Sequence, residues 1–119
     1  MNEPNDPLKI AAQYFELSNK SDFEAIGKLF ADTPTYSSES TGVYLGRDDI
    51  LAMQKQFHGR FSRLYWSINS VQELKPGVVV IDYDFTGTTR NHKTVTTSGL
   101  EYVIVSQNKI QHIEIRAKH

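Results

Sequence analysis

Glu101 stands in a sequence setting that favours acid–base or hydrogen-bonding chemistry. It shares one face of a predicted strand with Val103 and Val105, so period-two alternation directs it toward the core. A carboxyl group among apolar side chains is disfavoured in its charged form, which raises its pKa and leaves it a proton to donate. Such a group could polarise a carbonyl oxygen or hold a phenol. The alternative is a Glu101 at the sheet edge or in a dimer contact, since charged groups are rarely buried without a partner.

The other side chains that could do chemistry show no supporting pattern. Cysteine is absent, which excludes thiol nucleophiles and thiolate metal sites. The histidines lack the spacing of a metal site, and a cluster of serines lacks a histidine or lysine that could activate it. We therefore expect neither a metal nor a cofactor. These residues are His58, His92, His112 and His119, and Ser37, Ser38 and Ser40.

Length and charge exclude several classes of protein. The chain has 119 residues, which suits a single domain over 1–119, and its 13 basic and 14 acidic side chains give a formal net charge of -1. Without a broad positive field we expect no nucleic acid partner. No apolar run approaches the ~20 residues of a membrane span, and residues 1–6 form a polar, frayed lead rather than a signal peptide. We expect a cytoplasmic protein with no membrane partner.

The first half of the chain carries helix signals. Asp6 before Pro7 indicates a helix start, because the Asp oxygen can cap free amides and proline fits the first helical turn. Ser21 and Glu24 have the spacing of a capping box. Between the second and third helices the residues are β-branched, aromatic and small, which favours strands. The predicted elements are helices over 7–18, 22–31 and 48–59, with one or two strands within 33–45.

The second half changes to period two and predicts a meander. Val79, Ile81, Tyr83 and Phe85 share one face of a strand, so these odd positions should face the core. Helices that precede a run of strands indicate an α+β fold. We expect three N-terminal helices to close over a strongly curved, mixed or antiparallel sheet and to leave an apolar pocket with few polar groups. The predicted strands cover 62–74, 78–89, 94–106 and 109–118.

Four stretches carry a family resemblance that covers about residues 8 to 117. Together with the order of elements, they make the chain resemble the NTF2-like superfamily, most closely its SnoaL-like and ketosteroid-isomerase-like branch. The resemblance implies a cone-shaped, cystatin-like fold. It does not specify a reaction, because members include isomerases, cyclases and proteins without known activity. The stretches run from Tyr14 to Asp22, from Ile26 to Asp32, from Tyr44 to Ile50 and from Asn108 to Ala117.

The resemblance also implies roles for three residues. In ketosteroid-isomerase-like members a tyrosine on helix one and a protonated sheet acid form an oxyanion hole, and an aspartate after helix two moves the proton. Tyr14 matches the tyrosine, and Glu101 falls about where the acid is expected. Ser38 takes the position of the proton-moving aspartate, and strand alternation puts Glu39 on the opposite face, so the base is missing or moved. The alternative interpretation of Tyr14 is a core tyrosine.

The predicted function follows from this pocket. We expect binding of a small hydrophobic, carbonyl-containing molecule, with an isomerase- or cyclase-like activity; a non-catalytic binding or dimerisation domain is the alternative. On the outer sheet face His112 could pair with Asp82 or Asp84, but a homodimer contact is the default expectation there. The side chains expected to line the pocket are Phe15, Phe30, Met53, Phe57, Trp66, Tyr83, Phe85, Val103, Ile113 and Ile115.

Overall fold

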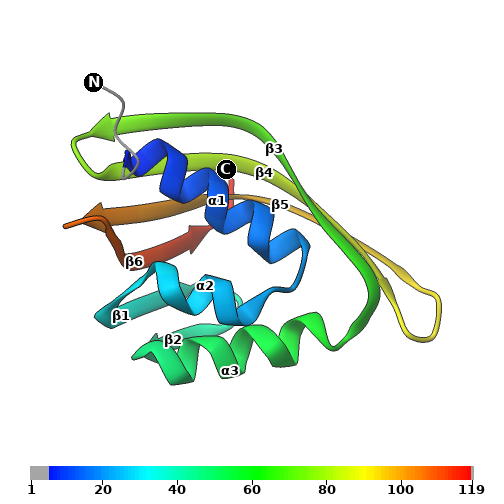
Figure 1. Ribbon diagram of the computed structural model, residues 1–119. Helices are drawn as coiled ribbons and strands as arrows, with labels where there is room; N and C mark the ends of the chain where they lie inside the picture. The colour runs from blue at the N-terminus through cyan, green and yellow to red at the C-terminus, as the bar shows by residue number, and fades with distance from the viewer. Residues whose placement is uncertain (1–5, 119) are drawn as a thin grey trace.

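A six-stranded sheet curves around three helices in the computed structural model, which describes residues 6–118 (Figure 1). Of the lead expected over residues 1–6 only Asp6 lies within this range, and His119 also falls outside the described residues. In chain order the elements are α1 (Pro7–Asn19), α2 (Phe23–Leu29), β1 (Phe30–Ser38), β2 (Gly42–Leu45), α3 (Arg47–His58), β3 (Phe61–Lys75), β4 (Val78–Thr89), β5 (Thr94–Ser106) and β6 (Lys109–Arg116).

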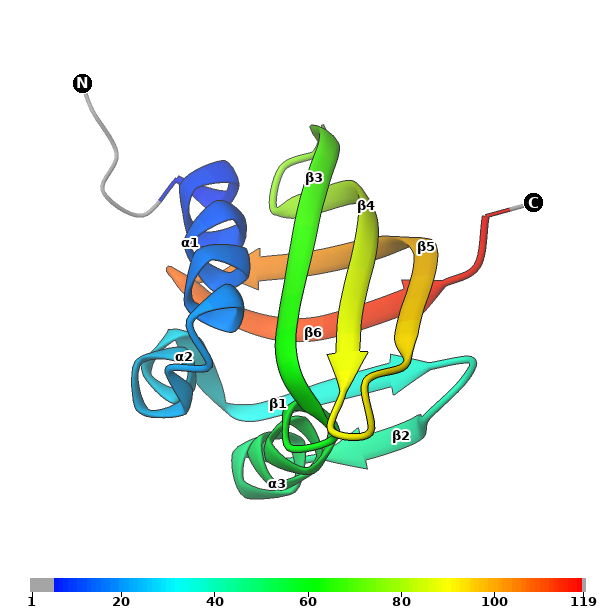
Figure 2. The ribbon, with the colours of Figure 1, turned by 90° about the vertical axis from the view of Figure 1, so that its right-hand side faces the viewer.

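The direction of the strands makes the sheet a mixed one. The strands follow the order β2-β1-β6-β5-β4-β3. β1 and β6 run parallel, with Tyr36 opposite Ile113, whereas the other neighbouring pairs are antiparallel. α1 lies across the concave side of the bent sheet, while α2 and α3 lie next to β1 and β2 (Figure 2). This arrangement confirms the predicted α+β fold with a strongly curved sheet.

Aspartate side chains cap the first two helices. Asp6 caps α1, as predicted. The cap of α2 is Asp22, whose carboxylate accepts a hydrogen bond from the backbone N–H of Ala25 at 3.2 Å. The predicted capping box was wrong, because Ser21 lies one residue too early and its hydroxyl bonds His58 instead.

The second helix ends at Leu29, two residues before its predicted end. Phe30 is already extended and pairs with Ile110 of β6. The Arg47 guanidinium donates to the carbonyl oxygens of Phe30 and Ala31 at 3.2 and 3.0 Å. The backbone groups after Leu29 therefore bond Arg47 and β6, whereas the helical period predicted that they would form another turn of helix.

Alternation in β4 and β5 decides which side chains enter the core. The odd positions of β4 from Val79 to Gly87 are buried, whereas Asp82 and Asp84 face the convex side. In β5, Glu101, Val103 and Val105 are buried as well. The predicted inward faces of both strands are therefore confirmed.

Asn19 ties the end of α1 to an edge of the sheet. Its side-chain amide donates to the Trp66 carbonyl oxygen at 3.0 Å, and its Oδ1 accepts from the Trp66 N–H at 2.7 Å. β3 is an edge strand, so Asn19 supplies the partner that a neighbouring strand would otherwise provide. This clamp also fixes where Trp66 stands relative to α1.

Within residues 6–118, no helix has the length and apolar character needed to cross a membrane. The cytoplasmic location and the assignment of residues 1–119 to a single domain stay predictions.

Replacing Asn19 with alanine should destabilise the protein by about 1–2 kcal/mol, because two partly buried backbone groups of Trp66 lose their partner. Urea unfolding followed by far-ultraviolet circular dichroism measures the change. Asn69→Ala is the control: the Asn69 amide bonds only the exposed carboxylates of Asp82 and Asp84, so about 0.5 kcal/mol or less is expected. Equal losses in the two variants would contradict the clamp.

Candidate ligand-binding site

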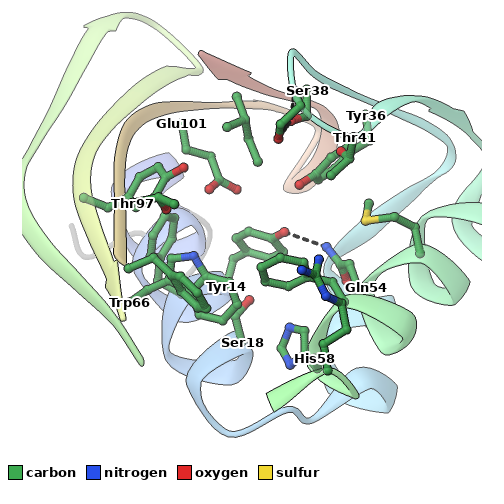
Figure 3. A pocket seen from close by; sticks show the side chains of 18 of the residues that line it. Tyr14, Ser18, Tyr36, Ser38, Thr41, Gln54, His58, Trp66, Thr97 and Glu101 are labelled. Atoms are coloured by element: carbon green, nitrogen blue, oxygen red, sulfur yellow. Dashed lines mark hydrogen bonds between the residues drawn. The ribbon is translucent and has the colours of Figure 1, made fainter. Parts of the chain in front are cut away.

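A cavity of about 270 Å³ opens between the helices and the concave face of the sheet (Figure 3). Aromatic rings form much of its wall, but hydroxyl, amide and carboxyl groups interrupt it more often than predicted. Such a wall suits a small ligand with an apolar body and a few polar atoms. The lining residues are Tyr14, Phe15, Ser18, Tyr36, Ser38, Ser40, Thr41, Met53, Gln54, Phe57, His58, Arg60, Trp66, Tyr83, Phe85, Val95, Thr97, Glu101 and Ile115.

The structure places seven of the ten expected lining residues at this cavity. Phe30, Val103 and Ile113 do not line it and are at most 1% exposed. Phe30 packs edge-on against the Tyr14 ring, and Val103 pairs with Ile113 across β5 and β6. An inward direction was therefore insufficient, because the core fills part of the concave face. The seven are Phe15, Met53, Phe57, Trp66, Tyr83, Phe85 and Ile115.

Glu101 brings a carboxyl group into the wall of the cavity (Figure 3). The residue is only 4% exposed, and no other described side chain or backbone group donates a hydrogen bond to it. Burial alone raises the pKa of the Glu101 carboxyl from its ordinary 4.5 to about 8. The group is therefore mostly protonated at neutral pH and is a hydrogen-bond donor.

Tyr14 lines the same cavity from α1. Its hydroxyl oxygen accepts a hydrogen bond from Gln54 Nε2 at 2.7 Å, which leaves the hydroxyl proton available to a ligand. Burial, and then the nearby Glu101 charge, raise the pKa of Tyr14 well above 10, while hydrogen bonds from Gln54 and Ser18 lower it. No hydrogen bond joins Tyr14 to Glu101 directly, but both groups face the cavity (Figure 3).

Gln54 and Tyr36 are polar lining residues that the sequence reasoning did not assign to the site. Gln54 is 6% exposed and interrupts the apolar face of α3 formed by Ile50, Met53 and Phe57. A lone amide in such a face was the available signal. Burial raises the pKa of Tyr36 well above 10, so its hydroxyl is also neutral.

Gly99 makes room for the Tyr83 ring in the floor of the cavity. The two residues are opposite each other in β5 and β4. A Cβ on Gly99 would lie 2.8 Å from the Tyr83 hydroxyl oxygen, closer than such atoms pack. The missing side chain therefore lets the tyrosine ring lie against the neighbouring strand.

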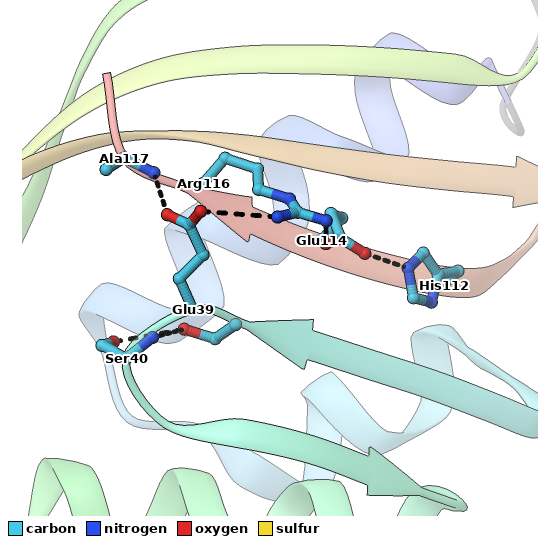
Figure 4. A network of polar contacts seen from close by, with 7 residues as sticks. Glu39, Ser40, His112, Glu114, Arg116 and Ala117 are labelled. Atoms are coloured by element: carbon cyan, nitrogen blue, oxygen red, sulfur yellow. Dashed lines mark hydrogen bonds and ion pairs between the residues drawn. The ribbon is translucent and has the colours of Figure 1, made fainter. Parts of the chain in front are cut away.

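Ser38 lines the cavity, and its hydroxyl contacts another serine rather than a base. Its hydroxyl oxygen lies 3.2 Å from that of Ser40 and accepts from the Ser40 N–H at 3.3 Å. Glu39 points to the other side, as alternation predicted: its carboxylate accepts from the Ala117 N–H at 2.9 Å and pairs with Arg116 at 3.4 Å (Figure 4). Glu39 thus does not replace the missing base.

His58 and Arg60 line the cavity near the end of α3, and neither was predicted there. The His58 Nδ1 lies 2.8 Å from the Ser21 hydroxyl, and rings of Phe23 and Trp66 pack around the imidazole. Burial lowers the pKa of His58 to about 4, so the imidazole is neutral at pH 7. A neutral ring can accept a proton.

Comparison with known proteins assigns the family. A family model described as a SnoaL-like domain matches residues 11–113. The chain belongs to this SnoaL-like family, within the NTF2-like superfamily. The resemblance to the SnoaL-like branch that the sequence motifs indicated is therefore confirmed. No curated protein matches the sequence.

Solved structures share the fold of this SnoaL-like chain at low identity. An NTF2-like protein of unknown function from Burkholderia pseudomallei has a TM-score of 0.84 and 11% identity, with 95% of this chain and 91% of that one covered. A hypothetical protein with a ketosteroid isomerase-like fold from Catenulispora acidiphila, in complex with trimethylamine, has a TM-score of 0.82 and 15% identity. The match covers 92% of this chain and 85% of that one. A protein described as a SnoaL-like polyketide cyclase from Jannaschia sp. has a TM-score of 0.81 and 11% identity. The match covers 97% of this chain and 88% of that one. These likenesses establish the fold.

On the convex face of the SnoaL-like sheet, His112 does not pair with Asp82 or Asp84. Its Nδ1 lies 2.6 Å from the Thr35 hydroxyl and its Nε2 lies 2.9 Å from Glu114 (Figure 4). Within residues 6–118, no group of three or more potential metal ligands gathers.

Glu101 should make the SnoaL-like fold less stable as the pH rises from about 4.5 to about 8. Below pH 4.5 the carboxyl is protonated in both the folded and unfolded states. Between the two values only the folded state keeps the proton, so the free energy of unfolding falls by up to ~1.4 kcal/mol per pH unit. Glu101→Gln cannot titrate. The free energy of unfolding of this variant, measured by urea unfolding and compared with that of wild type, should therefore rise between pH 4.5 and 8. If the free energies of the two proteins change with pH in parallel, the pKa of Glu101 is not raised.

Proposed function

We propose that this SnoaL-like protein binds a small hydrophobic molecule through a carbonyl oxygen. The observation that carries the proposal is the Glu101 carboxyl, which is buried in the cavity wall and lacks a hydrogen-bond partner among the described residues. The carboxyl group faces the cavity, where a ligand oxygen would supply a hydrogen-bond partner. Burial also keeps the carboxyl protonated, as its pKa of about 8 indicates.

Tyr14 supplies the second donor in this proposal. Because Gln54 donates to the hydroxyl oxygen, the hydroxyl proton of Tyr14 remains for a ligand. Two O–H donors on one carbonyl oxygen would polarise the carbonyl bond and stabilise negative charge that develops on the oxygen. The aromatic wall, which includes Phe57, Trp66 and Phe85, would take the apolar body of the ligand. A volume of about 270 Å³ favours a compact molecule.

Binding without turnover is the primary form of the proposal, because Ser38 stands where the resemblance implies a base. A cofactor-independent isomerase- or cyclase-like activity is the second candidate, because His58 lines the same cavity and its uncharged ring is a weak base. The imidazole could take a proton from the carbon next to a polarised carbonyl and return it elsewhere. The neighbour described as a polyketide cyclase agrees with that class of chemistry.

A matched pair of ligands tests the carbonyl contact. Methyl β-naphthyl ketone should bind about tenfold tighter than β-ethylnaphthalene, because only the ketone has an oxygen that can accept hydrogen bonds. A tenfold difference in affinity equals ~1.4 kcal/mol of binding free energy. Quenching of Trp66, the only tryptophan of the chain, reports binding inside the cavity. Tyr14→Phe should remove most of the preference, whereas Tyr65→Phe, at an exposed position, should keep it. Equal affinities for the two compounds in wild type would contradict the proposal.

We also propose a homodimer that forms through the convex face of the sheet. Val80 and Tyr102 are register partners on this face, Ile104 follows on the same strand, and all three remain partly exposed in the single chain. Aromatic and aliphatic side chains at the centre of a polar face suit a self-complementary contact.

Sedimentation velocity tests the dimer. Wild type should sediment as a dimer at micromolar concentration, and Tyr102→Glu should sediment as a monomer because it buries a charge in the contact. Ala52→Glu, on the exposed face of α3, should leave the dimer intact. A wild-type monomer at all concentrations would overturn this proposal.

A further inference from the structure

Basic side chains are concentrated at the end of the molecule where α3 meets the β4–β5 hairpin. Residues 50–72 and 85–100 contain no aspartate or glutamate, although the whole chain carries a formal charge of -1. These two stretches are neighbours, because Phe61 pairs with Thr89 and Arg63 with Thr88. The basic side chains at this end are Lys55, Arg60, Arg63, Arg90 and Lys93.

Arg60 is the member of this group that lines the ligand cavity. Its guanidinium lies over the rings of Phe57 and Phe61, with 5.6 Å to each ring centroid. Stacking on aromatic faces restricts the guanidinium and leaves its N–H donors for another partner. No ion pair joins Arg60 to an acid within residues 6–118.

The neighbouring cations have other positions. Arg63 lines a separate surface groove with Ser62 and Tyr65 rather than the cavity. The Arg90 Nε donates to the Gly59 carbonyl oxygen at 2.8 Å, which ties the hairpin to the end of α3. These cations add to the positive potential around the cavity without reaching into it, so a bound anion would meet Arg60.

We propose that the ligand of this cavity carries a carboxylate, which Arg60 binds, in addition to the carbonyl group held by Tyr14 and Glu101. The inference rests on the proposed function and narrows the ligand to a hydrophobic keto acid. The cavity wall offers the neutral O–H donors of Tyr14 and Glu101 and also the Arg60 guanidinium, whose paired N–H groups match a carboxylate. A ligand with both groups would therefore have a single orientation.

The keto acid β-naphthoylpropionate and its methyl ester provide the test, since the ester lacks the charge and adds only a methyl group. Isothermal titration calorimetry at neutral pH should show about tenfold tighter binding of the acid to wild type, because hydrogen bonds to charged groups exceed neutral ones. Arg60→Gln should reduce the preference for the acid to less than about twofold. Arg63→Gln loses the same charge outside the cavity and should keep the preference.

The outcomes separate the two proposals. Equal affinities of acid and ester for wild type, or an undiminished preference in Arg60→Gln, would overturn the carboxylate inference and leave the carbonyl proposal standing. An equal loss of preference in Arg60→Gln and Arg63→Gln would show long-range electrostatic attraction instead of a direct contact between Arg60 and the carboxylate. That result would also overturn the carboxylate inference. If wild type binds neither compound, both the proposed function and this inference fail.

Discussion

Burial of the Glu101 carboxyl with no hydrogen-bond partner among residues 6–118 is the constraint on which the rest of the site depends. The alternation that directs Glu101 inward also buries Val103 and Val105, so turning the carboxyl toward solvent would expose the core. The group instead remains neutral, and a neutral carboxyl donates a hydrogen bond where a carboxylate would accept one. Tyr14 complements it, because the Gln54 amide fixes the orientation of the hydroxyl. The cavity thus gains two donors.

Local sequence patterns predicted much of the fold because they reflect local physics. Period two placed Glu101 on the inward face, and Asp6 before Pro7 located the start of α1. The patterns failed where distant partners decide. The helical period extended α2 past Leu29, yet Arg47 and β6 claim the backbone that follows.

The candidate site was less predictable than the fold, for a related reason. An inward position distinguishes core from surface, but not core from cavity, so Phe30 and Ile113 were expected to line the pocket and instead fill the core. Conversely, His58 is the last residue of α3 and Arg60 follows the helix, where sequence period carries little information. Only the packing of α3 against β3 and the β4–β5 hairpin brings them to the cavity.

The protonation state of Glu101 in the protein without ligand can be measured directly. Carboxyl-labelled glutamate allows its ¹³C resonance to be followed through a pH titration, and the signal missing from Glu101→Gln assigns it. We expect a midpoint near pH 8 for this resonance, well above the ordinary 4.5. A midpoint near 4.5 would mean that the group is a carboxylate at neutral pH, and it would contradict the role of Glu101 as a donor.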